Sequence, residues 1–421
     1  MSPQTGVRMN KSYAPFFSLL LSTGILLAGN GLNNTLISLR GDIEDFSGTI
    51  IGMIGAFYYA GFFLGTFHCP RIVKRAGHIR AFAAFASLAS VAPLIHSLFP
   101  NEILWMILRA VTGYCFSGLF LIIESWLNEQ ASNETRARLF GTYLVINFIS
   151  MTLGQLLLNI ASPSGSTLFV LASILVSISL LPLTLTKSVQ PPAITAIKVN
   201  LRSLWKMSPI GTMGCFVVGL IGGSFWSLTP VFLRDSGLSV QNLTFFMSAF
   251  ILGGAVAQYP IGYLSDHTDR RWAIVFVTTC AAAAEIVLVL FSGKVSEYIF
   301  LLMAFGLGTF SLTLYSICVA QANDHTKEGD FVVVSGGLLL VFSIGAVIGP
   351  IINSTAMLFV DSYVIFVTAA CFHGAFGMFV LVLIAKISPL LPEERSEFVA
   401  VALSRTGPEP IQFDPRTKDI E

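Results

Sequence analysis

The chain has 421 residues, of which 54% are hydrophobic and 11% are charged, and its formal net charge is +1. A soluble protein carries roughly 25% charged residues, so this composition excludes a soluble enzyme, a disulfide scaffold and a disordered chain. The balanced charge gives no indication of nucleic-acid binding. The composition therefore predicts a polytopic membrane protein.

Twelve apolar runs are long enough, at about 20 residues each, to cross the hydrocarbon core as helices. They are continuously apolar, whereas the strands of a transmembrane barrel alternate, so the predicted fold is all-α. The first run is too long for a signal-peptide core and is expected to be retained. We expect the spans near residues 14–39, 48–69, 79–98, 102–128, 139–161, 165–186, 208–233, 240–264, 272–292, 296–321, 331–358 and 363–387.

Basic residues are distributed unequally between the two ends of these spans. If the N-terminus is inside, 16 Lys and Arg residues fall on the inner side and three on the outer side. Cytoplasmic loops carry an excess of Lys and Arg, so both termini are expected in the cytoplasm. The short predicted external loops favour a bacterial inner (plasma) membrane.

The longest predicted cytoplasmic connection divides the chain into two halves of six spans. Its last part, residues 201–207, is expected to lie on the membrane surface with its apolar side down. The expected organisation is a cytoplasmic N-terminus at 1–13, an N-terminal six-helix bundle at 14–186, a cytoplasmic linker at 187–207, a C-terminal six-helix bundle at 208–387 and a largely disordered cytoplasmic tail at 388–421.

The two halves are related in sequence. Gly113, Asn128 and Gly141 recur as Gly308, Asn323 and Gly336 at an offset of 195 residues, and the loops after spans two and eight correspond at an offset of 192. Two six-span repeats in the same orientation predict an axis along the membrane normal and a binding site between the halves.

Several motifs together resemble the major facilitator superfamily. The residues after span eight that match its loop motif are Gly262, Leu264, Asp266, Arg270 and Arg271. Arg109 with Gly113 in span four, and Gly345 with Gly349 and Pro350 in span eleven, resemble two further elements. The resemblance covers about residues 12–390 and is strongest to bacterial members described as sugar or drug transporters. It implies two pseudo-symmetric six-helix bundles.

The chain also departs from the family pattern in two places. In the first-half loop Lys74 stands where the family has Asp, and Pro70 where it has Gly. Span five has Gly154 and Gln155 but no proline, so the antiporter element is absent from its usual position. These departures weaken a simple transfer of the inner charge relay and of drug/proton antiport.

Polar side chains inside apolar spans are the candidates for solute binding. A charged residue at mid-helix costs ~2.5–3.5 kcal/mol on insertion scales and persists where it faces a partner or a wet cavity. Of the adjacent Tyr58 and Tyr59, only one is expected to face inward. For each candidate the alternative is helix packing or interhelical hydrogen bonding. The candidates are Asn30, Asn33, Asn34, Tyr59, Arg109, Asn147, Gln155, Trp226, Gln258 and Tyr315.

Three ionisable residues lie clearly within spans. The superfamily resemblance implies that Arg109 faces the cavity and helps proton coupling or anion binding; the alternative is a structural Arg that bonds backbone carbonyls. Glu124 follows on the same face, either as a titrating proton-coupling group or as a gate carboxylate paired with Arg71 or Arg75. Glu285 lies in a span that is usually peripheral in this fold, so a structural role is favoured over a proton role.

A set of charged residues near the inner face is predicted to form a gate. Asp266 with Arg270 and Arg271 is expected to lock the inner face when the carrier opens outward, the alternative being a solvated loop. The predicted gate residues are Arg71, Arg75, Glu129, Asp266, Arg270 and Arg271.

These features predict a secondary active transporter that moves a small polar or amphipathic solute by alternating access, with proton coupling. The alternatives are an uncoupled facilitator and, from another class, a non-transporting receptor or scaffold. The six cysteines form no CxxC pair, and no catalytic or phosphate-loop pattern occurs, so neither an enzyme, a cofactor nor a metal site is expected. The expected partners are the solute, protons and the lipid bilayer, with no nucleic acid, and the expected assembly is a monomer.

Overall fold

The computed structural model describes residues 14–130, 136–185, 200–292, 294–326 and 331–388. Within these ranges every regular element is a helix, and twelve helices are long and apolar enough to cross a membrane. The all-α fold with twelve spans is therefore confirmed. The span boundaries differ from the expected ones by a few residues, mostly because helices continue past the hydrophobic runs.

The first half contains α1 to α7 and the second contains α8 to α14. The N-terminal helices are α1 (Ala14–Ile43), α2 (Gly48–Ala76), α3 (His78–Leu98), α4 (Glu102–Gln130), α5 (Arg136–Leu157) with the 3-10 turn η1 (Leu158–Ile160), α6 (Thr167–Ile178) and α7 (Leu180–Thr184). The C-terminal helices are α8 (Leu201–Met207), α9 (Pro209–Asp235), α10 (Val240–His267), α11 (Arg270–Phe291), α12 (Glu297–Asn323), α13 (Phe331–Ala356) and α14 (Val364–Ile384).

Side-chain caps set several helix starts. Ser47 accepts from the Ile50 amide at the start of α2, and Ser239 accepts from an amide at the start of α10. Ser208 caps α9, whose first residue is Pro209, a position where a missing N–H costs nothing. Asp269 caps α11. These short polar residues satisfy amides that have no partner within their own helix.

The sixth span is interrupted. α6 ends at Ile178 and α7 begins at Leu180, with Pro182 inside the second piece. A proline lacks the amide proton and clashes with the carbonyl four residues earlier, which here belongs to Ile178. The hydroxyl of Ser22 in α1 donates to the Ser179 carbonyl at this break. The neighbouring helix therefore satisfies a carbonyl in the interrupted segment.

Glycine contacts reveal the internal repeat in three dimensions. A Cβ atom at Gly61 in α2 would collide with the Ala110 carbonyl of α4, and one at Gly253 in α10 would collide with the Phe305 carbonyl of α12. The reciprocal contacts place Gly113 against the Tyr58 carbonyl and Gly308 against the Phe250 carbonyl. The positions correspond at the offsets of 192 and 195 found in the sequence. The same backbone-to-backbone packing thus occurs in both halves.

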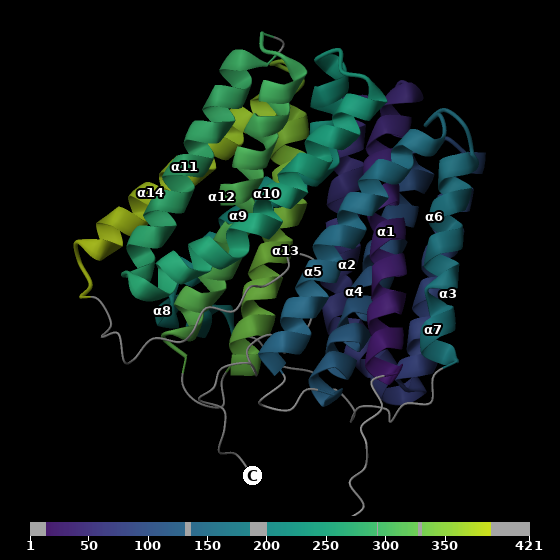
Figure 1. Ribbon diagram of the computed structural model, residues 1–421, viewed down its shortest axis with the longest axis horizontal. Helices are drawn as coiled ribbons and strands as arrows, with labels where there is room; N and C mark the ends of the chain where they lie inside the picture. The colour runs from purple at the N-terminus through teal and green to yellow at the C-terminus, as the bar shows by residue number, and fades with distance from the viewer. Residues whose placement is uncertain (1–13, 131–135, 186–199, 293, 327–330, 389–421) are drawn as a thin grey trace, which may run out of the picture.

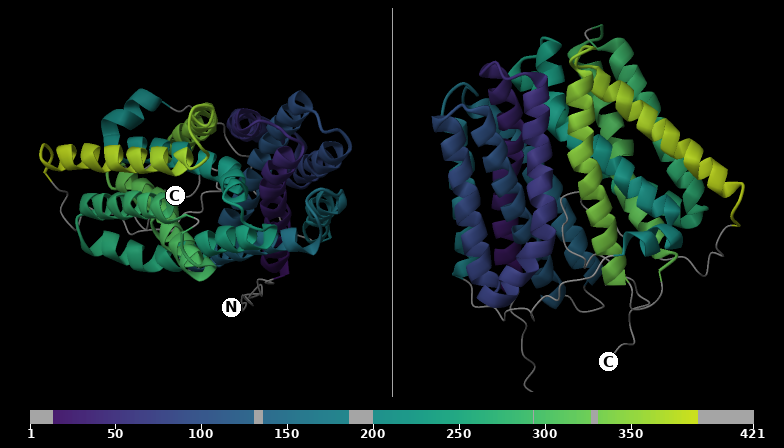
Figure 2. Two further views of the ribbon diagram at one scale, coloured as in Figure 1. Left: turned by 90° about the horizontal axis from the view of Figure 1, so that it is seen from above. Right: turned by 180° about the vertical axis from the view of Figure 1, so that it is seen from behind.

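The two halves stand side by side as bundles (Figures 1 and 2). In Figure 1, α1 ends and α2 begins at the top, here called the upper end, and α1 begins at the bottom, here called the lower end. α11 and α14 slant away from the N-terminal bundle toward the lower end. α8, which covers the segment predicted to be interfacial, lies at the lower end, with Leu204 buried and Trp205 exposed.

We predict that Gly308→Ala destabilises the protein while Gly306→Ala does not. Gly308 meets backbone atoms of Phe250 that cannot move aside, whereas a Cβ atom at Gly306 would meet nothing within 4 Å. Overpacking of this kind costs roughly 1–3 kcal/mol. Thermal unfolding in detergent, followed by size-exclusion chromatography, measures both variants. Equal melting temperatures for the two variants would contradict the close helix contact.

Candidate functional site

A cavity of about 860 Å³ lies between the two bundles. Its N-terminal wall comes from α1, α2, α4 and α5, and its C-terminal wall from α9, α10, α12 and α13. The wall alternates carboxamides with aromatic and aliphatic side chains, so it suits a solute with both polar and apolar parts. The lining residues are Asn30, Asn34, Tyr58, Tyr59, Phe62, Phe120, Asn147, Phe148, Met151, Gly222, Trp226, Ile251, Gln258, Leu312 and Phe342.

Arg109 of α4 lies in a smaller pocket that adjoins this cavity. Asn34, Tyr58, Tyr59 and Trp226 line both spaces. The Arg109 guanidinium donates from Nη2 to Asn34 Oδ1 at 3.0 Å and stands 4.3 Å from the ring centre of Tyr58. Its Nε and Nη1 atoms are buried and have no hydrogen-bond partner among the residues that the structure describes. Within the described residues no carboxylate lines either space.

Several of the predicted binding residues are thus brought together around one space. The cavity and the adjoining Arg109 pocket contain Asn30, Asn34, Tyr59, Arg109, Asn147, Trp226 and Gln258. Their convergence follows from the packing of α1, α2, α4 and α5 against α9 and α10, which no single helix pattern specifies.

Asn33, Gln155 and Tyr315 lie outside the lining of both spaces. Gln155 is buried between α1 and α5, where Oε1 accepts from Thr35 and Nε2 donates to the Gly31 carbonyl. Tyr315 is buried with its ring 5.5 Å from that of Phe342. Asn33 is also buried. These contacts of Gln155 and Tyr315 therefore join neighbouring helices.

Both adjacent tyrosines reach the cavity, so the expectation that only one faces inward is wrong. Tyr58 and Tyr59 line the central cavity and the Arg109 pocket, and their rings meet edge to face at 5.3 Å. Consecutive residues lie 100° apart around a helix. Long side chains on either side of the inward direction can still reach one broad cavity. The contacts of Gly61 and Gly113 hold this part of α2 against α4.

Glu124 lies far from Arg109 along the same helix. Fifteen residues separate them, which is about 22 Å at 1.5 Å per residue. Glu124 is buried but lines neither the cavity nor the Arg109 pocket. Of the two predicted proton-coupling residues, only Arg109 is thus placed at the cavity.

The predicted gate residues occupy the lower end. Arg71 and Arg75 are exposed at the end of α2, and the side chain of Glu129 lies outside the described residues. Arg270 is fully buried; it donates from Nε to Asp324 Oδ2 at 3.0 Å and from Nη2 to Asp266 Oδ1 at 3.1 Å. These contacts join α10, α11 and α12 within the C-terminal bundle.

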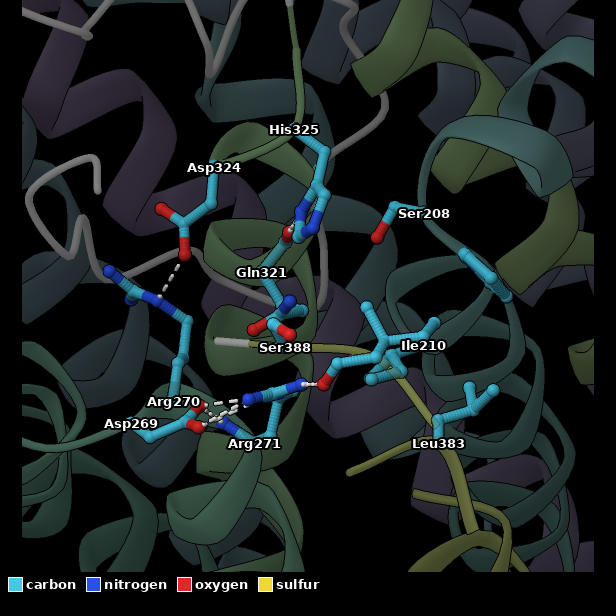
Figure 3. A pocket seen from close by; sticks show the side chains of 12 residues that line it. Ser208, Ile210, Asp269, Arg270, Arg271, Gln321, Asp324, His325, Leu383 and Ser388 are labelled. Atoms are coloured by element: carbon cyan, nitrogen blue, oxygen red, sulfur yellow. Dashed lines mark hydrogen bonds and ion pairs between the residues drawn. The ribbon is translucent and has the colours of Figure 1, made fainter. Parts of the chain in front are cut away.

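Arg271 completes this cluster beside a pocket of about 500 Å³ (Figure 3). Its Nη2 atom pairs with Asp269 Oδ2 at 2.7 Å, and Nη1 donates to the Ile387 carbonyl beyond α14 at 2.6 Å. Charge-assisted hydrogen bonds of this kind are short and strong. They fix the lower ends of four helices to one another as a unit.

Two residues of these networks were not singled out as functional candidates from the sequence. Asp324 appeared only as part of a repeat match, although an acid at the end of a span was a usable signal. His373 gave no signal, because a single histidine in an apolar run is common. In the structure its Nδ1 atom lies 3.0 Å from Glu285 Oε2, and both residues are buried.

At the upper end the bundles touch through small residues and hydroxyl groups. Ser38 of α1 donates to the Ser227 carbonyl of α9 at 2.8 Å, and Asn159 donates to Thr244 of α10 at 2.8 Å. A Cβ atom at Gly55 would collide with the Ser227 side chain. An ion pair between Asp42 and Arg234, at 2.5 Å, bridges the bundles at the rim. The upper end is therefore closed.

Known proteins share both the sequence pattern and the fold. The chain matches the family model described as Major Facilitator Superfamily over residues 19–350 and 211–411. It is 27% identical over 347 residues to the protein described as "Uncharacterized MFS-type transporter YcaD" of Escherichia fergusonii. The aligned region covers 81% of this chain and 88% of that protein. An Escherichia coli protein of the same description is 28% identical over 349 residues, with the same coverage.

Solved structures agree with this relationship at the level of the fold. The crystal structure of the nucleoside transporter NupG has a TM-score of 0.71 at 12% identity and covers 88% of this chain and 98% of that one. A bacterial homologue of the human lysosomal transporter Spinster has a TM-score of 0.68 at 15% identity, with the same coverage. The twelve-span fold, the repeat and the family match together lead to one conclusion: this chain is a transporter that belongs to the major facilitator superfamily.

Proposed function

We propose that this transporter is a secondary carrier for a small amphipathic organic anion, which it moves by alternating access. The observation that carries the proposal is Arg109, a buried cation beside the central cavity with two nitrogens that lack hydrogen-bond partners. The solute would supply the missing negative charge. The anion would pair with Arg109 in the cavity and dissociate from it on the other side of the membrane.

The electrostatic argument starts from the cost of an isolated buried charge. Removing an ion from water costs several kcal/mol in real proteins even after relaxation. The Tyr58 face and the Asn34 oxygen recover part of this cost, at ~0.5–2 kcal/mol for a cation–π contact and ~1.5–3 kcal/mol for a hydrogen bond to a charged group. A planar guanidinium with free N–H groups is suited to a carboxylate or phosphate. An anionic solute therefore satisfies the site better than a neutral one.

The cavity walls favour an amphipathic body on that anion. Asn30, Asn147 and Gln258 offer donors and acceptors without charge, while Phe62, Phe120, Phe148 and Phe342 offer apolar rings. Polar groups at a few fixed points in an apolar wall are typical of sites for small molecules. A solute with one charged group and a ring or short chain matches this lining.

Alternating access is supported by the two unlike ends of the molecule. The upper end is held closed by contacts between α1, α2 and α9, while α11 and α14 slant away from the other bundle toward the lower end. The basic residues concentrate at the lower end, so we propose that this end faces the cytoplasm of a bacterial inner membrane. The structure then represents the inward-facing state. Rocking of the two bundles would expose the cavity to the other side.

We further propose that a proton gradient drives this carrier. A tenfold difference in proton concentration across the membrane is worth about 1.4 kcal/mol, which supports about tenfold accumulation of an anion carried with one proton. Charge balance also favours coupling, since an anion and a proton that cross together carry no net charge through the low-dielectric interior. An uncoupled facilitator would move the charge of the anion alone.

Benzoate is expected to stabilise the purified transporter, whereas its neutral amide, benzamide, is not. Binding at ten times the dissociation constant adds about 1.4 kcal/mol to the free energy of unfolding, which a thermal-shift measurement detects. Arg109→Gln should abolish the benzoate effect, and Arg109→Lys should weaken it because bidentate contact is lost. Phenyl phosphate extends the test to a second anion.

Arg202→Gln is the matched control, because Arg202 is exposed on α8 and far from the cavity. It should retain the full benzoate response. Stabilisation by benzamide alone, or an equal response to benzoate in Arg109→Gln and the parent protein, would refute an anion site at Arg109.

A steric wedge at Gly55 is expected to hold the upper end open. Gly55 of α2 packs directly against Ser227 of α9, so Gly55→Trp leaves no room for closure. In sealed vesicles, a reporter cysteine in place of Tyr59 should then react from the upper side with a membrane-impermeant thiol reagent. The same reporter without the wedge should react slowly from that side.

Gly374→Trp provides the control for this wedge, since a side chain at Gly374 meets nothing within 4 Å. Protein with the wedge but without the reporter corrects for the native cysteines. If Gly55→Trp folds and upper-side labelling stays at the level of Gly374→Trp, the closed upper end is not a gate.

A further inference from the structure

A second buried polar site lies inside the C-terminal bundle. Glu285 of α11 and His373 of α14 face each other, with 3.0 Å between Oε2 and Nδ1, and each is 1% exposed. Glu285 lies in a span without other charges inside it, and His373 comes from the last span. A buried acid and a buried base in direct contact form a proton-sharing pair.

This pair lines a cavity of about 520 Å³ whose other walls are largely aromatic and aliphatic. Two hydroxyls in the lining, Thr229 Oγ1 and Ser311 Oγ, are buried and have no hydrogen-bond partner within the described part of the chain. Buried polar atoms are normally satisfied by protein or water. Two unpartnered hydroxyls beside an acid–base pair therefore indicate a space suited to a polar ligand, to water or to proton transfer.

Trp226 connects this cavity to the proposed anion site. Its side chain lines the cavity of the pair, the central cavity and the Arg109 pocket. Gly222 and Leu312 are also shared between the first two of these spaces. The pair and Arg109 thus belong to different bundles, and the cavity of the pair and the Arg109 pocket share Trp226 as a lining residue.

Within the described residues, no third ionisable side chain faces the pair. The neighbouring helices present Phe225, Trp226 and Thr229 from α9, Phe250 from α10, Leu307 and Ser311 from α12, and Ile365, Phe366 and Ala369 from α14. Arg109 lines a pocket that shares Trp226 with the cavity of the pair, while Glu124 lines none of the three spaces. The charge state of the pair is thus free to respond to the occupant of the cavity.

From this arrangement we propose that Glu285 and His373 form the proton-binding site of the carrier. We propose that the carrier holds this proton and an organic anion at the same time. The inference rests on the anion site proposed at Arg109. With one proton between them the two side chains are neutral as a unit. Loss of that proton, from the Glu285 oxygen or the His373 nitrogen to water in the cavity, leaves one negative charge.

Charge balance then produces coupling. With an anion bound at Arg109 and the proton on the pair, the three groups and the solute sum to zero. With neither bound, the Arg109 cation and the deprotonated pair again sum to zero. States with only one of the two carry a net charge in a low-dielectric interior, which is unfavourable. The carrier therefore reorients fully loaded or fully empty, as a symporter of anion and proton.

Infrared spectroscopy of solute-free protein in proteoliposomes tests the proton site. Difference spectra between mildly acidic and mildly alkaline pH should contain the C=O band of a protonated buried carboxyl and an imidazole band. Glu285→Gln should remove the first, and His373→Gln should remove the share of one histidine from the second and shift the midpoint of the first. Glu102→Gln, an exposed acid at the start of α4, should leave both unchanged.

The proposal is overturned if both bands persist unchanged in Glu285→Gln. If that variant does not fold, as judged by size-exclusion chromatography, His373→Gln decides alone: a spectrum identical to that of the parent protein overturns the proposal. This measurement needs no solute, so it remains decisive even if the anion site fails.

Coupling is tested by proton uptake in weakly buffered detergent solution. Benzoate, adjusted to the pH of the sample, should cause alkalinisation with the parent protein, and benzamide should not. Glu285→Gln should lose the uptake while benzoate still raises its melting temperature. Benzoate binding without proton uptake in the parent protein would overturn the coupling. Absence of any benzoate effect on stability would count against the anion site alone.

Discussion

The uncompensated charge of Arg109 is the constraint on which the proposed mechanism depends. A guanidinium in the middle of an apolar helix is retained only if its surroundings stabilise it, and here those surroundings are one carboxamide and one aromatic ring. The close packing of α2 and α4 provides that ring, because Gly113 meets the backbone of Tyr58. A larger residue at Gly113 would move Tyr58 away from the guanidinium. The scaffold contact and the binding site are therefore one structural unit.

The internal repeat explains how one architecture can hold two different sites. The α2–α4 contact in the first half and the α10–α12 contact in the second use equivalent glycines and carbonyls. At the repeat offset, however, Arg109 corresponds to Ala304, and Tyr58 corresponds to Phe250. The second half has no cation at this place, and the buried Glu285 and His373 lie instead on α11 and α14. Shared packing thus carries different chemistry in the two bundles.

Much of the fold could be predicted from the sequence because a membrane restricts the choices. Apolar runs of spanning length must be helices. The break of the sixth span could not have been located from Pro182 alone, because Pro93 and Pro260 lie inside continuous helices. Arg109 stood out as a charge in an apolar run. The partners of these residues could not be predicted, because His373 lies 88 residues beyond Glu285 and no periodicity links them.

Spacing along a helix also failed to predict which side chains reach the cavity, because neighbouring helices determine the surroundings of each residue. Asn147 and Gln155 lie on one row of α5, yet only Asn147 reaches the cavity. Gly31 and Gly154 let α1 and α5 approach closely, so the Gln155 amide is used between those helices. The row predicts a polar face but not which neighbour that face meets.

The contacts that close the upper end are weak individually, and this determines what controls reorientation. The ion pair between Asp42 and Arg234 is partly exposed, and exposed pairs contribute ~0–1 kcal/mol. The remaining contacts use hydroxyls, carbonyls and small residues, which lose little when they separate into water. At the lower end the buried Arg270 network stays within one bundle, so it can move as a rigid body without breaking. In the proposed mechanism neither end therefore holds the transporter in one state by itself, and the cost of a net charge in the forms that hold only the anion or only the proton restricts reorientation to the fully loaded and the empty forms.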